Sequence, residues 1–138
     1  ATVRIIVVSI GQNIGFLIII YTAGLQTIPK EVMESAGLDG CSGLKKVLKI
    51  ELPLLMPTVT INLFVSISGA FKSFDIPNAM TGGGPYGSTM PVAMNIYQEA
   101  FTKYNLGYGS AKSVILFLTV AAVTLIQLYC TRKKEVEY

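Results

Sequence analysis

The sequence contains no histidine and no tryptophan, only two cysteines, and few charged residues. Because there is no histidine, and because Cys41 and Cys130 lie 89 positions apart, the chain lacks the residues for a zinc site, for histidine acid–base catalysis or for a Cys–His nucleophile. Charged residues make up 14% of the 138 residues, whereas a soluble domain carries roughly 25%. A soluble enzyme is therefore not expected, and we predict neither a catalytic residue nor a metal site.

Long hydrophobic segments dominate the chain, and 51% of its residues are hydrophobic. Three mostly apolar runs carry no charge and hold 20, 18 and 17 residues: Ile5–Gly24, Leu54–Phe71 and Val114–Cys130. A helix needs about 20 residues to cross the ~30 Å hydrocarbon core of a bilayer. The sequence thus predicts an all-α fold, a polytopic membrane helical bundle with about three transmembrane helices at residues 5–24, 54–71 and 112–130.

The basic residues predict how these helices are oriented. The net charge is only +3, and the basic residues are too scattered for a nucleic-acid surface. Seven of the eleven lie between the first two runs or after the third, and Lys and Arg are enriched in cytoplasmic segments of membrane proteins. We expect residues 25–53 and the C-terminus in the cytoplasm and residues 72–110 outside. These seven are Lys30, Lys45, Lys46, Lys49, Arg132, Lys133 and Lys134.

Polar residues in the first two runs recur at helical spacing. Such residues should face protein or water, since a polar group facing lipid is costly. Ordinary packing between membrane helices explains them as well, because small and polar residues are enriched at such contacts. The functional hypothesis is that both stripes face a shared cavity and contact a polar solute. The stripes are Ser9, Gln12, Asn13 and Phe16 in the first run and Asn62, Ser66, Gly69 and Ser73 in the second.

The predicted outer segment, residues 72–110, is long for a connection between helices, and long loops are usually functional or disordered. It retains many aromatic residues, and Pro91–Tyr104 could form a short amphipathic helix at the membrane interface. Thr81-Gly82-Gly83-Gly84-Pro85 predicts a tight turn. It is not a phosphate-binding loop, because no Lys-Ser or Lys-Thr pair follows it and no strand precedes it.

The predicted cytoplasmic segment carries the most specific pattern. Pro29 suits a first helical turn, and Gly37–Gly40 predicts a break after it. Ser42 could cap a second helix that runs to Glu51, and Pro53 marks its end or a kink. The segment is thus predicted to form two short helices joined by a glycine turn.

A family resemblance rests on this segment. Glu34-Ser35-Ala36 is followed by three residues and Gly40, then by nine residues and Ile50-x-Leu52-Pro53. This spacing resembles the Glu-Ala-Ala loop of the membrane subunits of binding-protein-dependent ABC importers, with Ser35 in place of the middle alanine. Similarity to the sugar-importer branch, of maltose, lactose or glycerol-phosphate type, rests on Ile28-Pro29, Asp39-Gly40 and Thr81-Gly82-Gly83-Gly84-Pro85.

The resemblance covers essentially the whole chain and implies how it would work. Family members have at least three helices before this region, so residues 1–138 would be the C-terminal part of one transmembrane domain. The loop forms coupling helices that dock in a cleft of the cytoplasmic ATPase. Glu34 would offer a carboxylate to a basic or amide partner there; without the resemblance, Glu34 would be a solvated acid paired with Lys30. The coupling positions implied are Glu34, Ser35, Ala36, Gly37, Asp39 and Gly40.

The resemblance also implies the solute contacts and the partners. The sugar-contacting positions of the family fall near Gln12, Asn13, Phe16, Ser66, Ala70 and Ser73. Ala70 replaces a polar residue of the maltose type, which argues against maltose itself. The implied partners are a second permease subunit, ATPase subunits that bind the ATP, an extracytoplasmic solute-binding protein, the lipid bilayer and a sugar. The implied location is a bacterial or archaeal inner membrane, and no cofactor is expected on this chain.

Two alternatives remain open from the sequence. The first is an importer of the same architecture for another solute class, such as amino acids, peptides or polyols, which the glycine-rich outer turn disfavours. The second is a membrane enzyme or structural subunit unrelated to ABC transport. Such an enzyme would need catalytic residues in the spans, and Gln12 or Asn62 alone cannot supply acid–base chemistry at neutral pH.

Overall fold

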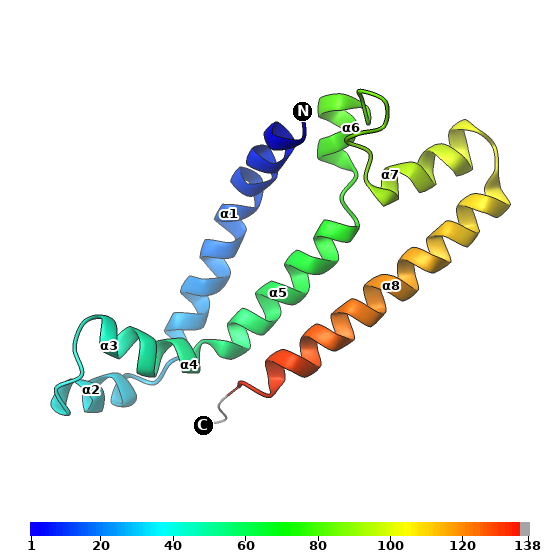
Figure 1. The fold of residues 1–138 in the computed structure, drawn as a ribbon. Helices are drawn as coiled ribbons and strands as arrows, with labels where there is room; N and C mark the ends of the chain where they lie inside the picture. The colour runs from blue at the N-terminus through cyan, green and yellow to red at the C-terminus, as the bar shows by residue number, and fades with distance from the viewer. Residues whose placement is uncertain (136–138) are drawn as a thin grey trace.

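The computed structural model describes residues 1–135, and every regular element in that range is a helix (Figure 1). Three long helices, α1 (Thr2–Gln26), α5 (Met56–Phe71) and α8 (Leu106–Arg132), form the body. α5 lies between the other two and contacts both. α1 and α8 contain the first and third uncharged runs completely, and α5 contains the second run except for its first two residues. The predicted all-α membrane helical bundle is confirmed.

The two longest helices have the length and composition of membrane spans. α1 holds 25 residues and α8 holds 27, and most of their apolar side chains are exposed on the chain's own surface. At 1.5 Å per residue each is longer than the ~30 Å hydrocarbon core. α1 ends just before Pro29, because the residue before a proline is disfavoured in helical geometry.

The middle span begins with a sharp bend. The 16 residues of α5 are preceded by a helical stretch, Leu44–Leu54, and the two axes differ by 66°. The break falls at Leu55, between Pro53 and Pro57. Pro57 has no N–H to donate to the carbonyl four residues earlier, and its ring crowds that carbonyl. The end or kink predicted at Pro53 is present as a bend two residues later, at Leu55, and α5 itself starts two residues later than the predicted span.

The segment before α5 folds into the two short helices that the sequence predicts. α2 (Lys30–Leu38) is followed by a turn in which Gly40 and Gly43 have φ values of 71° and 61°, a conformation that favours glycine. The second helix consists of α3 (Leu44–Lys46), the π-helical segment η1 (Val47–Glu51) and α4 (Leu52–Leu54). The predicted cap at Ser42 is wrong. Gly43 occupies the cap position and the helix starts without a side-chain hydrogen bond.

The segment between α5 and α8 is helical over much of its length. α6 (Asp75–Thr81), which the sequence analysis missed, contacts α1 and is followed by the glycine-rich turn. The predicted short helix is present as α7 (Val92–Tyr97) and the π-helical segment η2 (Gln98–Thr102). Both pack against the start of α8, and Figure 1 shows them folded back along it. We call residues 98–112, which comprise η2, the connection after it and the first two turns of α8, the elbow.

Candidate functional site: a polar pocket between α1 and α5

A pocket lies between the middle of α1 and the second half of α5. Its volume is about 630 Å³, within the range of small-molecule sites. The chain that leaves α5 and starts α6 closes one side of it. From α1 the wall takes seven residues between Ser9 and Leu17, which together cover one side of that helix. The wall includes the polar, aromatic and small residues Ser9, Gln12, Asn13, Phe16, Ser66, Gly69, Ala70 and Ser73.

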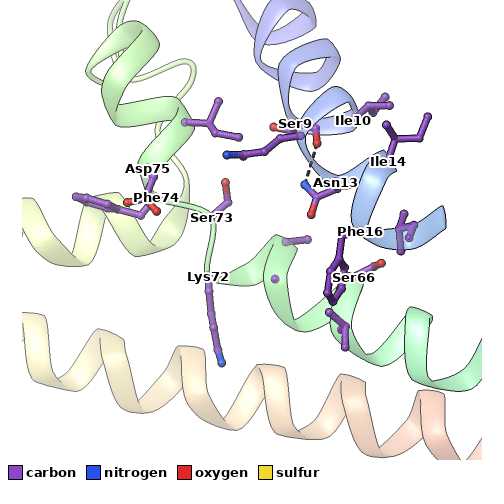
Figure 2. Close-up of a pocket in the computed structure, with 16 residues that line it drawn as sticks. Ser9, Ile10, Asn13, Ile14, Phe16, Ser66, Lys72, Ser73, Phe74 and Asp75 are labelled. Atoms are coloured by element: carbon purple, nitrogen blue, oxygen red, sulfur yellow. Dashed lines mark hydrogen bonds between the residues drawn. The ribbon is translucent and has the colours of Figure 1, made fainter. Parts of the chain in front are cut away.

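The polar groups of the pocket come from both helices. Asn13 donates its Nδ2–H to the backbone oxygen of Ser9 at 2.8 Å, and Figure 2 shows its Oδ1 turned away from that carbonyl. Ser66 lies opposite on α5, and Ser73 lies just beyond the end of that helix. Hydroxyl and amide groups that converge from two sides can hydrogen-bond a polyhydroxylated molecule.

One aromatic ring contributes to the same wall. Phe16 is 51% exposed and its ring projects from α1 toward Ser66 (Figure 2). Apolar walls with a few placed polar groups are typical of ligand sites. The ring of Phe16 can cover the apolar face of a ring-shaped solute while Asn13 and Ser66 bond its edge.

The structure brings together five of the six predicted pathway residues. Gln12, Asn13, Phe16, Ser66 and Ser73 all line the pocket, as does Ala70. The sixth, Asn62, lies one helical turn before Ser66 and is only 2% exposed, so it does not line the cavity.

Two charged residues of the wall were missed. Lys72 and Asp75 border the pocket where α5 ends and α6 begins. The Lys72 side chain extends away from Asn13 in Figure 2. Both residues lie within two positions of Ser73, which could have indicated that they border the pocket. They were missed because the helix that begins at Asp75 was not predicted.

The predicted coupling residues form a separate surface on α2 and the turn after it. Glu34, Ser35, Gly37, Asp39 and Gly40 are all exposed. Among residues 1–135, no ion pair joins Lys30 to Glu34, so the carboxylate is available to another partner.

Ala36 differs from its neighbours on α2. It is 5% exposed, and its backbone oxygen accepts the N–H of Cys41 at 3.0 Å. Its small side chain therefore fits a contact within the chain. Leu38, at 90% exposed, and Leu44, at 79%, are the large apolar side chains of this surface instead.

The glycine-rich turn after α6 is tight, as the sequence predicts. Gly82 and Gly83 have φ values of 57° and 86°, and Gly84-Pro85 follows with a cis peptide bond. The Thr81 and Thr89 hydroxyls lie 2.7 Å apart, and the Thr89 hydroxyl donates to the Gly84 oxygen at 2.7 Å. These bonds close the turn on itself.

Taken together, spans, pocket and exposed helix define a multi-pass helical membrane protein with a polar cavity between its spans and a short helical surface outside them. The comparison with known families makes this specific. The chain belongs to the family of binding-protein-dependent transport system inner membrane components, whose sequence model matches residues 1–136. It is therefore a multi-pass inner-membrane protein.

Individual relatives are permease proteins of transport systems. A sulfoquinovosyl glycerol transport system permease protein of Agrobacterium fabrum is 40% identical over 91% of this chain and 41% of its own. An sn-glycerol-3-phosphate transport system permease protein of Brucella abortus is 37% identical over 94% and 45%. A multiple sugar-binding transport system permease protein of Streptococcus mutans is 33% identical over 99% and 47%. The chain thus spans less than half the length of these relatives.

Proposed function

We propose that the chain forms part of the membrane pathway of an ABC importer permease subunit that carries a sugar or a sugar-like solute. The observation that carries this proposal is the pocket between α1 and α5, in which amide, hydroxyl and aromatic groups converge. The names of the relatives support the solute class, since they refer to a sulfoquinovosyl glycerol, a glycerol phosphate and sugars. An importer for amino acids or peptides is less well supported by these names.

The second part of the proposal concerns energy coupling. Glu34 to Gly40 would dock against a cytoplasmic ATPase subunit, with Leu38 as the apolar contact and Glu34 as the charged one. No atom of the described chain lies within 4 Å of the place where a Cβ of Gly37 would be, so this side of α2 is open to a partner. A nucleotide-driven movement of the ATPase could then reach α5 through the bent stretch Leu44–Leu54.

The remaining partners follow from the family. A second permease subunit would complete the pathway, and an extracytoplasmic solute-binding protein would deliver the solute. ATP would bind to the ATPase partner, so this subunit would itself be neither an enzyme nor the carrier of a cofactor. The alternative of a membrane enzyme is less well supported, because the names of the relatives refer to transport system permease proteins.

A cysteine cross-link tests the coupling surface in the full-length protein within its assembled transporter. Cys41 and Cys130 are replaced by serine, Gly37→Cys is introduced, and single cysteines are placed along the candidate ATPase cleft. We expect a specific cross-link whose yield changes with ATP. Gly107→Cys, at a second glycine with open space around it on the predicted outer side, is the matched control. Absence of any cross-link in a transport-competent complex would disprove the coupling role.

Uptake measurements test the solute class in the same complex. Labelled sugars, sugar phosphates and amino acids are offered to proteoliposomes together with the binding protein and ATP. We expect uptake of a polyhydroxylated solute that competes with unlabelled sugar. Uptake restricted to amino acids or peptides would contradict the proposal and favour the alternative importer.

A further inference from the structure

A buried amide without partners lies next to the pocket. Asn62 is 2% exposed, and among residues 1–135 neither its Oδ1 nor its Nδ2 has a hydrogen-bond partner. Burial of a polar group that makes no hydrogen bond is unfavourable, and an apolar side chain of similar size would avoid that cost. A buried donor and acceptor without partners among the described residues therefore point to a partner that is not always present.

The position of Asn62 on α5 relates it to two contacts. Thr58, Asn62 and Ser66 are spaced four residues apart, so they follow one another along one face of the helix. Ser66 lines the pocket. Thr58 touches α1 at Gly24, where an added Cβ would lie only 2.8 Å from Thr58 Cγ2 and 2.9 Å from Thr58 Cβ. Along α5, Asn62 thus lies between Ser66 of the pocket and Thr58, which contacts Gly24 of α1.

We propose that Asn62 is a second hydrogen-bonding station for the solute, and that the Gly24–Thr58 contact closes it off from the pathway beyond. The inference rests on the proposed function, because the solute must first occupy the pocket. A carboxamide offers one acceptor and two donor hydrogens in a plane, which matches adjacent hydroxyl groups. When α1 and α5 separate at Gly24, a solute leaving Ser66 reaches Asn62 one turn further along α5.

Thiol accessibility tests the exposure of Asn62 during transport. Asn62→Cys is made in the full-length, otherwise cysteine-free protein, and the assembled transporter is labelled with a small charged methanethiosulfonate. We expect labelling about tenfold slower than for Ser66→Cys at rest, and an increase during ATP turnover that added solute suppresses. An unchanged rate in every nucleotide state, or an increase that solute does not suppress, would overturn the proposal.

The closing contact can be opened by one methyl group. Gly24→Ala places a Cβ against Thr58 and should hold the helices apart, so Asn62→Cys becomes labelled even at rest. Gly15→Ala on the same helix is the matched control, because nothing lies within 4 Å of its Cβ position. Adding Thr58→Gly to Gly24→Ala removes the side chain that the new methyl group meets, so labelling of Asn62→Cys should become slow again. Unchanged labelling in Gly24→Ala would show that this contact does not close the site.

Binding and transport measurements separate this inference from the proposed function. Asn62→Leu should lower the maximal uptake rate about tenfold while leaving solute affinity at the pocket within about twofold. Expression and assembly are verified by the yield of the complex, and Asn62→Ser, which keeps a polar group, should recover part of the rate. Wild-type uptake by Asn62→Leu would overturn the second station alone. If the wild-type complex took up no polyhydroxylated solute, the proposed function and this inference would fail together.

Discussion

The elbow and the α1–α5 pair use polar residues in opposite ways. In the elbow, Glu99 is 8% exposed and lies 2.8 Å from Lys103 Nζ and 3.6 Å from Lys112 Nζ. Lys112 also donates to Asn95 Oδ1 at 2.7 Å and lies 4.4 Å from the centre of the Tyr108 ring. Each charge of this cluster has a partner within the chain, which is the arrangement expected of groups that hold a structure together.

The α1–α5 pair leaves more of its polar groups available, although Asn13 Nδ2 donates to the backbone oxygen of Ser9. Gln12, Asn13, Ser66 and Ser73 border an open cavity, and the buried amide of Asn62 has no partner among the described residues. The elbow cluster includes the amide of Asn95, and the α1–α5 pair includes those of Asn13 and Asn62, so the presence of an amide does not distinguish the two regions. The difference is whether hydrogen-bonding capacity is satisfied inside the chain, and unsatisfied capacity around a cavity indicates a binding role.

The tight packing of the elbow gives the largest expected effect on stability. A Cβ at Gly109 would lie 2.8 Å from Ala100 Cβ and 3.1 Å from Ala100 Cα, so α8 would have to move away from η2. We expect Gly109→Ala to lower the free energy of unfolding by about 2 kcal/mol. Gly107→Ala, two residues earlier with open space around it, is the control. Denaturant titration of the purified complex measures both, and equal stability of the two variants would show that the elbow is not tightly packed.

A substitution in the pocket should have the opposite effect from one in the elbow. It should weaken solute binding and leave the stability of the protein unchanged. Asn13→Leu removes the amide that faces the cavity, and we expect solute affinity to fall about tenfold, or about 1.4 kcal/mol. Ile18→Ala, on α1 but outside the pocket wall, should bind normally. Equilibrium binding to the detergent-purified transporter measures both affinities. A large loss of thermal stability in Asn13→Leu would instead make this residue a structural one and break the comparison.

Much of this arrangement could be predicted from the sequence because it depends on local patterns. Uncharged runs of nearly 20 residues give the long helices. The break predicted over Gly37–Gly40 is present at Gly40, while α2 continues through Gly37 to Leu38. The stripes at three- and four-residue spacing identified five residues of one pocket, since helical periodicity fixes which side chains share a face. These two faces meet because α1 and α5, two long helices joined by the short helices between them, pack against each other.

Other features depend on contacts that local patterns do not reveal. α6 was missed because Pro77 interrupts a short polar segment, although proline is tolerated in a first helical turn. Ala36 could be identified as a small residue, but its burial depends on the turn at Cys41. Asn62 and Ser66 belong to one stripe, yet Asn62 is buried and Ser66 is exposed. Helical spacing shows which residues share a face of α5, but how deeply each is buried depends on how the neighbouring helices pack.

The smallest expected effect comes from the charges of the elbow, and it depends on pH. The hydrogen bond from Lys103 lowers the pKa of Glu99 below its ordinary value of 4.5, desolvation by burial opposes that shift, and the charges of Lys103 and Lys112 add to the lowering. A carboxyl whose pKa is lower in the folded state contributes stability above its unfolded pKa, and this contribution is lost as the pH falls through the folded value. We therefore expect Glu99→Gln to be less stable than the wild type at pH 7.

The difference between the two proteins should shrink once the pH falls below about 4.5, because protonated Glu99 and glutamine are both neutral. Thermal unfolding of the complex between pH 7 and pH 3 measures it. Glu31→Gln, at an exposed acid that forms no ion pair among residues 1–135, should change little across the same range. If Glu99→Gln were as stable as the wild type at pH 7 but impaired solute uptake, the cluster would belong with the pocket rather than with the structural polar groups. Whether the hydrogen bonds of a polar residue are satisfied within the chain would then no longer distinguish residues that stabilise the fold from residues that bind the solute.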